Sequence, residues 1–312
     1  MTRLRQRADA FSTSPLVVLT VGIFAVSTAS ILIRYAQPEV PSLTIGTYRL
    51  AIASLVLLPF ALGHHWRELR ELQARDWVLG IASGVFLALH FATWITSLEY
   101  TTVASSVVLV TTSPLWVALG GWLLLHERLR RPIILGLMLT VTGGIIIGAG
   151  DTLQGPHGAS LFGNALALTG AVMVAGYWLI GRRLRARLPL LPYVAVVYCS
   201  AAVASLMMTL GSHQSLMGYE PMVYLWLVLL GLVPQLIGHS SFNWALARLP
   251  ATFVAIATLG EPIGSTLLAC LLLNEMPSLL GVFGGALVLT GIVLTFWSKT
   301  SSQKPMRNDQ ST

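Results

Sequence analysis

Two ionisable side chains lie inside long apolar stretches of this chain of 312 residues. Arg49 falls within an apolar run that spans 42–63, and Glu261 falls near the middle of a run that spans 251–273. A charged group inside an apolar segment is costly, so such groups usually bind ions, protons or polar solutes. We expect Arg49 to attract an anionic group and Glu261 to bind a proton. The alternatives are a packing role for Arg49 and a Glu261 carboxyl that caps the backbone freed by Pro262.

Two histidines in other apolar runs each have a polar or aromatic partner four positions later. The pairs are His90 with Trp94 and His239 with Asn243. Residues four apart share one face of a helix, so each pair presents a joint surface. Imidazole, indole and amide groups hydrogen-bond or stack on polar solutes. We expect both pairs to line one central cavity, with a purely structural histidine as the alternative.

A third set of side chains lies at equivalent depths in two further runs. Ser27 belongs to the first run, and Tyr177 with Trp178 belongs to the sixth. These groups either contact a solute or join neighbouring helices, and the sequence leaves both readings open.

The composition requires a lipid-embedded fold around these residues. Hydrophobic residues make up 55% of the chain and charged residues only 10%, where about 25% is usual in a soluble domain. A helix needs about 20 apolar residues to cross a bilayer. We therefore predict an all-α membrane protein with ten transmembrane helices, at 15–35, 42–63, 77–97, 103–125, 132–150, 159–181, 190–210, 222–243, 251–273 and 279–298.

The basic residues set the predicted orientation. With the N-terminus in the cytoplasm, 17 of the 19 Lys and Arg fall in cytoplasmic segments, while the opposite loops around Glu39, Glu99, Asp151, Glu220 and Glu275 contain none. Such a bias is the positive-inside pattern of membrane proteins. It places both termini in the cytoplasm and accounts for the net charge of +7 without a nucleic-acid partner.

The chain repeats itself at an offset of 148 residues. Between 109 and 147, 10 of 39 positions are identical to those 148 later. Aligned pairs include Gly22 with Gly170, Arg34 with Arg182, Pro114 with Pro262, Glu127 with Glu275, Gly136 with Gly284 and Gly143 with Gly291. We predict two five-helix halves, 1–150 and 151–312. Five is an odd number, so the second half enters the membrane inverted, as in many carriers.

Motifs of other functional classes are incomplete in this sequence. The His126–Glu127 dipeptide lacks the second histidine of a zinc-protease motif, and Gly148 to Gly150 lack the third glycine of a dinucleotide loop. Neither a metal-ligand spacing nor a Ser/His/Asp set is present. We therefore expect no enzyme activity, no cofactor and no metal.

The order and spacing of several short motifs resemble the EamA type of the drug/metabolite transporter superfamily. They are YRL at 48–50, LHFATW at 89–94, TSPL at 112–115, LHERL at 125–129, GHSSFN at 238–243, GEPI at 260–263 and LNE at 273–275. The resemblance covers nearly the whole chain and adds Tyr48 to the candidate contacts. It implies export of small metabolites such as amino acids from a bacterial cytoplasm, across the inner membrane.

The resulting hypothesis is a secondary carrier that exports a small metabolite by alternating access. Its partners would be the substrate, protons and bilayer lipid, and the sequence sets no oligomeric state. An anion-exchanging carrier of sugar nucleotides or phosphorylated metabolites is one alternative, although only one Arg and no Lys lie deep in the apolar runs. A membrane enzyme or sensor is the alternative from another class.

Overall fold

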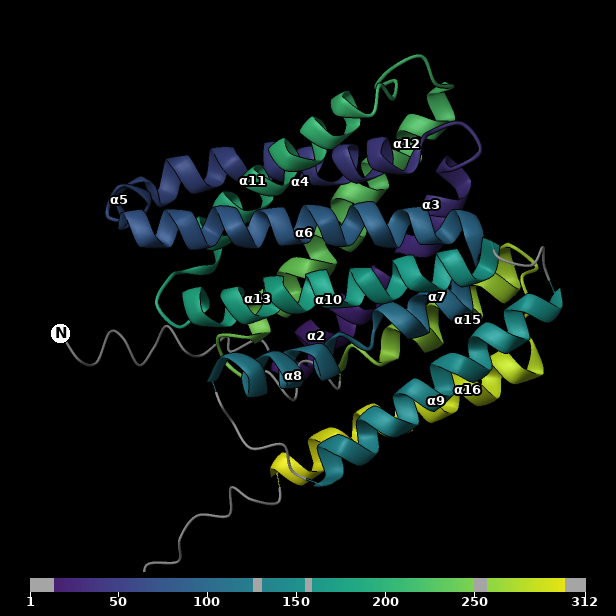
Figure 1. Ribbon diagram of the computed structural model, residues 1–312. Coiled ribbons are helices and arrows are strands. Elements are labelled where there is room, and N and C mark those ends of the chain that lie inside the picture. Colours follow the sequence, from purple (N-terminus) through teal and green to yellow (C-terminus); the bar gives the residue numbers. More distant parts are fainter. Residues whose placement is uncertain (1–13, 126–130, 155–158, 250–256, 301–312) are drawn as a thin grey trace, which may run out of the picture.

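The computed structural model describes residues 14–125, 131–154, 159–249 and 257–300, and in these residues all regular structure is helical (Figure 1). The helices are α2 (Pro15–Ser27), α3 (Ala29–Ala36), α4 (Ser42–His64), α5 (Trp66–Arg70), α6 (Ala74–Tyr100), α7 (Val103–Val110), α8 (Ser113–Leu125), α9 (Arg131–Gln154), α10 (Ala159–Arg185), α11 (Leu190–Gly211), α12 (Pro221–Leu230), the π-helix η2 (Gly231–His239), α13 (Ser240–Ala245), α15 (Gly260–Leu272) and α16 (Leu279–Thr300).

Six helical stretches have the length and apolarity needed to cross a membrane. They are Pro15–Ala36, Ser42–His64, Ala74–Tyr100, Ser160–Arg185, Leu190–Gly211 and Pro221–Ala245. The other four predicted spans contain shorter apolar helices, at Val103–Val117, Ile134–Ile147, Gly260–Leu272 and Leu279–Leu294. All-helical architecture is thus observed in the described residues, and the count of ten spans stays a prediction.

The outward faces of these helices are apolar. Phe24, Leu55, Val78, Met207 and Leu271 each expose 65% or more of their surface. Apolar surface spread over several helices in this way marks contact with other molecules rather than with water. The buried positions, in contrast, hold many polar groups. This distribution fits a bundle surrounded by lipid with a polar interior.

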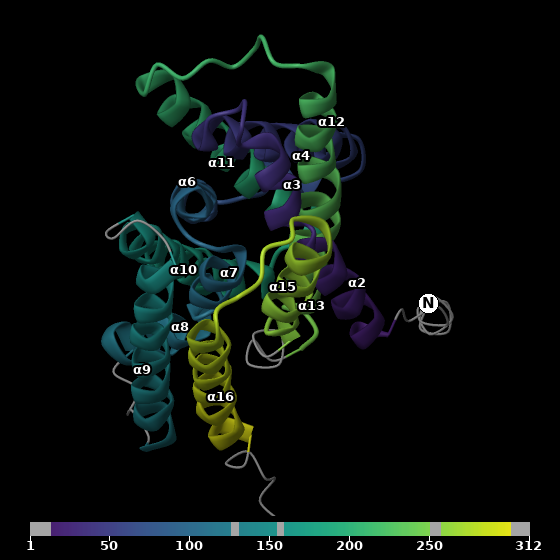
Figure 2. The same ribbon diagram turned by 90° about the vertical axis from the view of Figure 1, so that its right-hand side faces the viewer.

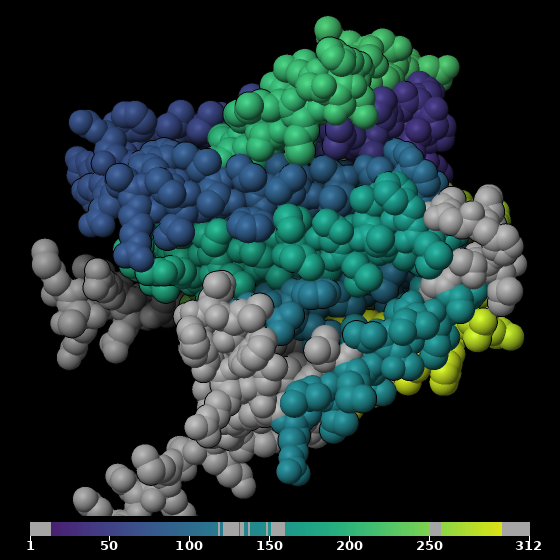
Figure 3. Space-filling model, in the orientation of Figure 1, coloured from purple at the N-terminus to yellow at the C-terminus, as the bar shows by residue number. Residues whose placement is uncertain are grey.

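Helix packing follows the symmetry that an inverted repeat requires. Corresponding helices of the two halves pack against each other as α4 with α11 and α9 with α16, and α15, the counterpart of α8, packs against α7. The contact of α6 with α10 likewise has its counterpart in that of α2 with η2. Figure 2 shows α9 and α16 together at one side of the bundle, and Figure 3 shows α6 and α10 side by side across one face.

Glycines of both halves set the contact between α9 and α16. A Cβ atom on Gly143 would lie 2.5 Å from the carbonyl oxygen of Gly284, and one on Gly291 would lie 2.6 Å from that of Gly136. The repeat aligns Gly143 with Gly291 and Gly136 with Gly284, so it converts one contact into the other. Helices α9 and α16 are therefore antiparallel and related by the internal symmetry. Small residues of this kind let helix backbones approach closely in membranes.

The bundle has two chemically different ends. One, which we call the basic end, carries Arg67, Arg70, Arg182, Arg183 and Arg187. The other, the acidic end, carries Glu39, Glu99, Glu220 and Glu275. In Figure 1 the basic end lies toward α5 and the acidic end lies toward the start of α12.

Two of the predicted continuous spans are interrupted. α7 ends at Val110 and α8 begins at Ser113, with Thr111 and Thr112 in a turn between them; Pro114, which has no backbone N–H, follows directly. In the second half a turn at 258–259 precedes α15. The offset of 148 aligns Thr111 with Leu259, so the two breaks are equivalent. Broken helices of this kind usually border a cavity.

Candidate functional site

A small cavity lies at the two helix breaks. Its volume is ≈ 50 Å³, and both halves of the chain contribute to its wall. The first half supplies Arg49, His90, Trp94, Val110, Thr111 and Ser113, and the second supplies Val174, Trp178, His239, Phe242, Thr258 and Glu261. Two helix beginnings, those of α8 and α15, therefore meet the same polar space.

Arg49 is the most deeply buried cation in the cavity wall, with 1% of its surface exposed. Its Nε–H donates to Oε1 of Gln235 over 2.9 Å. The guanidinium carbon lies 4.0 Å from the ring centre of Phe91, an attractive cation–π geometry. Nη1 has no hydrogen-bond partner among the described residues. The charge is thus held by an amide and an aromatic face rather than by a carboxylate.

The π-helix explains how Gln235 reaches Arg49. A Cβ atom on Gly231 would lie 2.7 Å from Ile52 and 3.3 Å from the carbonyl oxygen of Arg49, so α4 and η2 touch along their backbones. Pro234 inside η2 lacks a backbone N–H, which favours the wider turn. Single π-helical turns are frequent at functional sites, and here one brings the amide beside the arginine.

His90 has a fixed ring orientation. Its Nδ1 lies 2.9 Å from the carbonyl oxygen of Gly170, so Nδ1 carries a hydrogen and donates it. Nε2 is then the ring atom left for a ligand. The imidazole stacks on Trp94 with ring centres 5.9 Å apart and planes 9° from parallel. Gly170 has no side chain, which lets α10 lie close to α6 at this point. A Cβ atom on Gly170 would lie only 3.3 Å from the Cβ of Trp94.

His239 approaches the same wall from η2. Its ring meets Phe91 edge-on at 5.4 Å, and Phe91 in turn lies 4.8 Å from the ring of His90. Nδ1 of His239 has no partner among the described residues. The two histidines therefore flank one phenylalanine, and only His90 is anchored to a neighbouring backbone.

Glu261 and Trp178 complete the set of predicted residues that line the cavity. Glu261 lies in the first turn of α15, where the helix dipole stabilises a negative charge. It forms no ion pair with Arg49 within the described part of the chain. Trp178 packs edge-on against Phe242 at 6.4 Å. The cavity wall thus contains a cationic and an anionic side chain that attract each other electrostatically without forming a direct ion pair.

The four remaining predicted residues lie outside this wall. Tyr177 and Asn243 are fully buried and hydrogen-bond each other, with 3.0 Å from the tyrosine hydroxyl to Oδ1. Ser27 donates to the carbonyl oxygen of Ile23 and lies against Gly264 of α15. Tyr48 donates to the carbonyl oxygen of Leu216 near the acidic end. Their roles as substrate contacts stay predictions.

Several residues of the site escaped the sequence interpretation. Phe91 and Gln235 hold Arg49, and Thr111, Ser113 and Thr258 line the cavity at the helix breaks. For Ser113 the repeat offered a signal, because Ser113 aligns with Glu261; Thr111 and Thr258 align with Leu259 and Val110 and had none. Phe91 and Gln235 carried no such signal. Within the described residues, no cluster of three or more His, Cys, Asp or Glu could hold a metal ion.

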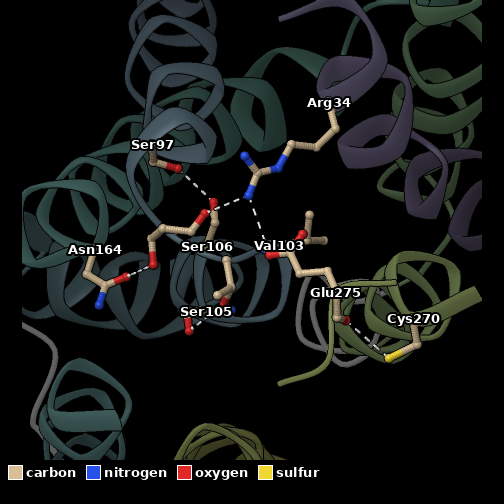
Figure 4. A network of polar contacts seen from close by, with 10 residues as sticks. Arg34, Ser97, Val103, Ser105, Ser106, Asn164, Cys270 and Glu275 are labelled. Carbon is tan, nitrogen blue, oxygen red and sulfur yellow. Dashed lines mark hydrogen bonds and ion pairs between the residues drawn. The ribbon is translucent and has the colours of Figure 1, made fainter. Parts of the chain in front are cut away.

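A second polar network, which we call the acidic-end tie, connects helices at the acidic end (Figure 4). Arg34 of α3 donates to the carbonyl oxygen of Thr101 over 3.0 Å and lies 3.4 Å from Oε1 of Glu275. The same carboxylate oxygen accepts the backbone N–H of Val103 over 2.7 Å. One arginine and one carboxylate therefore join α3, the start of α7 and the segment that follows α15.

This tie has no described counterpart at the basic end. Arg182, which the repeat aligns with Arg34, is exposed, and no partner for it is found among the described residues. Glu127, the repeat equivalent of Glu275, lies outside the described residues, and at the basic end Arg187 pairs instead with Asp76 of α6.

Comparisons with known proteins agree with this architecture. The model of the EamA-like transporter family matches residues 13–149 and 161–297. An uncharacterized transporter of Archaeoglobus fulgidus is 24% identical over 283 residues, which cover 90% of this chain and 96% of that protein. A probable terminal-alkyne amino-acid exporter of Streptantibioticus cattleyicolor is 25% identical over 205 residues, or 60% of this chain and 62% of its own.

A solved crystal structure has the same fold. It covers 93% of this chain and 99% of its own length with a TM-score of 0.66, at 21% sequence identity.

Proposed function

The chain belongs to the EamA-like transporter family, a family of multi-pass membrane transporters, and from that premise we propose that it is a secondary carrier that exports small metabolites by alternating access. Amino acids and their analogues are the proposed substrate class. The relative named as a probable terminal-alkyne amino-acid exporter supports this choice.

The observation that carries the proposal is the central cavity at the two helix breaks. Arg49, His90 and Trp94 reach it from the first half, and His239 and Glu261 reach it from the inverted second half. Carriers built from inverted repeats bind their substrate at this interface, beside discontinuous helices. A membrane enzyme has no corresponding need for two matched halves around one polar space.

The size of the cavity indicates that the halves must move. A volume of ≈ 50 Å³ holds water molecules but no amino acid, since pockets for drug-sized ligands measure about 300–1,000 Å³. In the proposed cycle the cavity widens toward one end at a time. The Arg34–Glu275 tie keeps the acidic end closed in this state, and it breaks when substrate leaves there.

Charge supports the proposed orientation. The basic end would face the cytoplasm of a bacterium and the acidic end would face outward across the inner membrane, in accord with the positive-inside rule. Both termini would then be cytoplasmic, with ten helices in the membrane. Release at the acidic end corresponds to export.

Glu261 is the proposed proton site. Among the described residues it is the only carboxylate in the cavity wall, and it forms no direct ion pair with Arg49 of the same wall. Binding and release of one proton there would change the charge of the cavity during the cycle. Glu261 lies in the first turn of α15, and the segment that follows α15 carries Glu275 of the Arg34–Glu275 pair. A change of charge at Glu261 would therefore act on the helix that leads to this pair.

A growth screen tests the proposed function. A sensitive bacterium that expresses the protein is exposed to toxic amino acids, their analogues, nucleobases and cationic drugs, with an empty vector and a His90→Ala/His239→Ala variant as controls. We expect resistance to one chemical class that the variant lacks. Resistance that persists fully in the variant would reject the cavity as the transport site, and the absence of any resistance would argue against export of these compounds.

A further inference from the structure

Two hydrogen-bond donors in the cavity wall have no acceptor. Nη1 of Arg49 and Nε1 of Trp94 lack a partner among the described residues, although these side chains expose only 1% and 3% of their surfaces. Guanidinium and indole nitrogens can donate but cannot accept. A buried donor without an acceptor is costly, and native proteins rarely leave one unless another molecule satisfies it. We therefore expect the cavity to bind a ligand that carries hydrogen-bond acceptors.

The two donors belong to neighbouring side chains. The guanidinium carbon of Arg49 lies 5.7 Å from the ring centre of Trp94, and both side chains border the same cavity. Nε of Arg49 is already engaged by Gln235, which fixes the plane of the guanidinium and leaves its terminal nitrogens available. A carboxylate has two oxygens that can accept from an arginine and a neighbouring N–H at the same time.

The beginning of α8 adds a third favourable element. Ser113, the first residue of this helix of 13 residues, also lines the cavity, and the first turn contains no acidic residue. The positive end of the helix dipole is therefore not neutralised within its own helix. In the other half, Glu261 occupies the first turn of α15 and neutralises that helix end. The positive potential of the cavity is thus concentrated around Arg49, Trp94 and α8.

We propose that the cavity recognises its substrate through a carboxylate group, which binds to Arg49 and Trp94. This inference rests on the proposed function, because it assigns a substrate class to the same site. A doubly charged phosphate is disfavoured, since Arg49 is the only Lys or Arg that the described residues contribute to the cavity wall, and Glu261 adds a negative charge. The cognate substrate is accordingly a monocarboxylate, either anionic or zwitterionic.

Ligand-induced thermal stabilisation of the purified full chain tests this assignment. The probes are pairs that differ only in one group: amino acids, N-acetyl amino acids and simple monocarboxylates, each beside its primary amide, together with the corresponding amines. We expect carboxylates to raise the melting temperature and their amides to bind at least about 10-fold more weakly, because a charge-assisted hydrogen bond is lost. Equal binding of amides or amines, or no binding by any carboxylate, would overturn the proposal.

Variants separate recognition from folding. Arg49→Gln should weaken carboxylate binding about 10- to 100-fold and leave amide binding unchanged. Trp94→Phe, which keeps an aromatic ring but loses the N–H together with part of the indole, should weaken carboxylate binding less. Arg185→Gln is the matched control, since Arg185 is also buried but lies at the basic end of α10. An equal loss in Arg185→Gln would assign a merely structural role to Arg49.

Transport measurements keep the two proposals distinguishable. Carboxylate binding without efflux from proteoliposomes would reject the carrier function and leave the substrate class intact. Efflux of compounds that carry no carboxylate would reject the substrate class and leave the carrier function intact.

Discussion

The Nε–H of Arg49 donates a 2.9 Å hydrogen bond to Oε1 of Gln235, and this bond joins the first half of the chain to the second beside the central cavity. The arginine has no carboxylate partner among the described residues, so its charge is neutralised only in part. The amide thus holds the guanidinium in position without competing for an anionic ligand.

Replacement of Gln235 by glutamate tests this relationship. Gln235→Glu should keep the protein folded, with an unchanged or higher melting temperature, because the new carboxylate pairs with Arg49. It should nevertheless raise the apparent KM for substrate by at least about 10-fold, since the ion pair neutralises the arginine. Gln235→Leu should instead lower stability by about 1.5–3 kcal/mol, because the arginine loses a charge-assisted hydrogen bond. Wild-type transport by Gln235→Glu would contradict the role given to Arg49.

The acidic-end tie predicts an effect on access from that side. Glu275→Leu removes the ion pair with Arg34 and also the acceptor for the Val103 N–H. The lost acceptor is the larger effect, because partly exposed ion pairs contribute only about 0–1 kcal/mol. A thiol introduced in the cavity should therefore react faster with an impermeant reagent added at the acidic end. Glu39→Leu is the control, because Glu39 also accepts a backbone N–H at this end, from Glu220, but lies outside the tie. An equal acceleration in both variants would contradict the assignment.

The contact between α9 and α16 predicts a stability defect without a change in substrate affinity. Gly143→Ala places a methyl group against the Gly284 carbonyl and should destabilise the protein by about 1–3 kcal/mol through overpacking. Gly63→Ala meets no atom within 4 Å and should be neutral or stabilising. Thermal unfolding in detergent measures both. Apparent KM should stay at the wild-type value in Gly143→Ala, because neither helix borders the cavity; a changed KM would refute this peripheral role.

Proton coupling is tested at Glu261. Glu261→Gln removes the titratable group from the cavity and keeps its size, so we expect substrate counterflow to persist while a pH gradient no longer drives accumulation. Glu220→Gln at the acidic end should behave like the wild type. If Glu261→Gln retained full pH-dependent transport, another group would have to carry the proton.

Much of the helical framework was predictable because apolar runs and the repeat are properties of the sequence itself. The 148-residue offset aligned Gly136 with Gly284 and Gly143 with Gly291, but the contacts of Gly143 with Gly284 and of Gly136 with Gly291 are known only from the structure. The breaks at Thr111 and at 258–259 were missed, because a turn of two residues leaves the apolar run of the sequence uninterrupted.

The cavity wall was predictable only where a residue type is unusual in an apolar run. Arg49, His90, Trp94 and His239 stood out for that reason. Phe91 did not stand out, because phenylalanine is common in apolar helices and its contact with Arg49 is visible only in the structure. The π-helix had a faint signal, since His239 aligns with His90 at an offset of 149 rather than 148, and a π-helical turn contains one additional residue.

His239 and Asn243 lie at the junction of η2 and α13. Four positions along a regular helix share a face, yet His239 borders the cavity while Asn243 hydrogen-bonds Tyr177 and Tyr198 away from it. η2 ends at His239 and α13 begins with the next residue, so the pair straddles a change of helical geometry. A spacing rule for regular helices cannot foresee that change.

The central claim is that one cavity opens alternately toward both ends of the bundle. Its most direct test is the reactivity of a cysteine at Ser113, a cavity-lining residue with 8% of its surface exposed. The variant would be made in a Cys199→Ser/Cys270→Ser background, since both native cysteines are free thiols, and Ser83→Cys, buried between α6 and α10, would serve as the unreactive control. An impermeant maleimide is added separately to right-side-out and inside-out vesicles. We predict that Ser113→Cys is labelled from both sides and Ser83→Cys from neither; labelling of Ser113→Cys from one side alone would contradict alternating access.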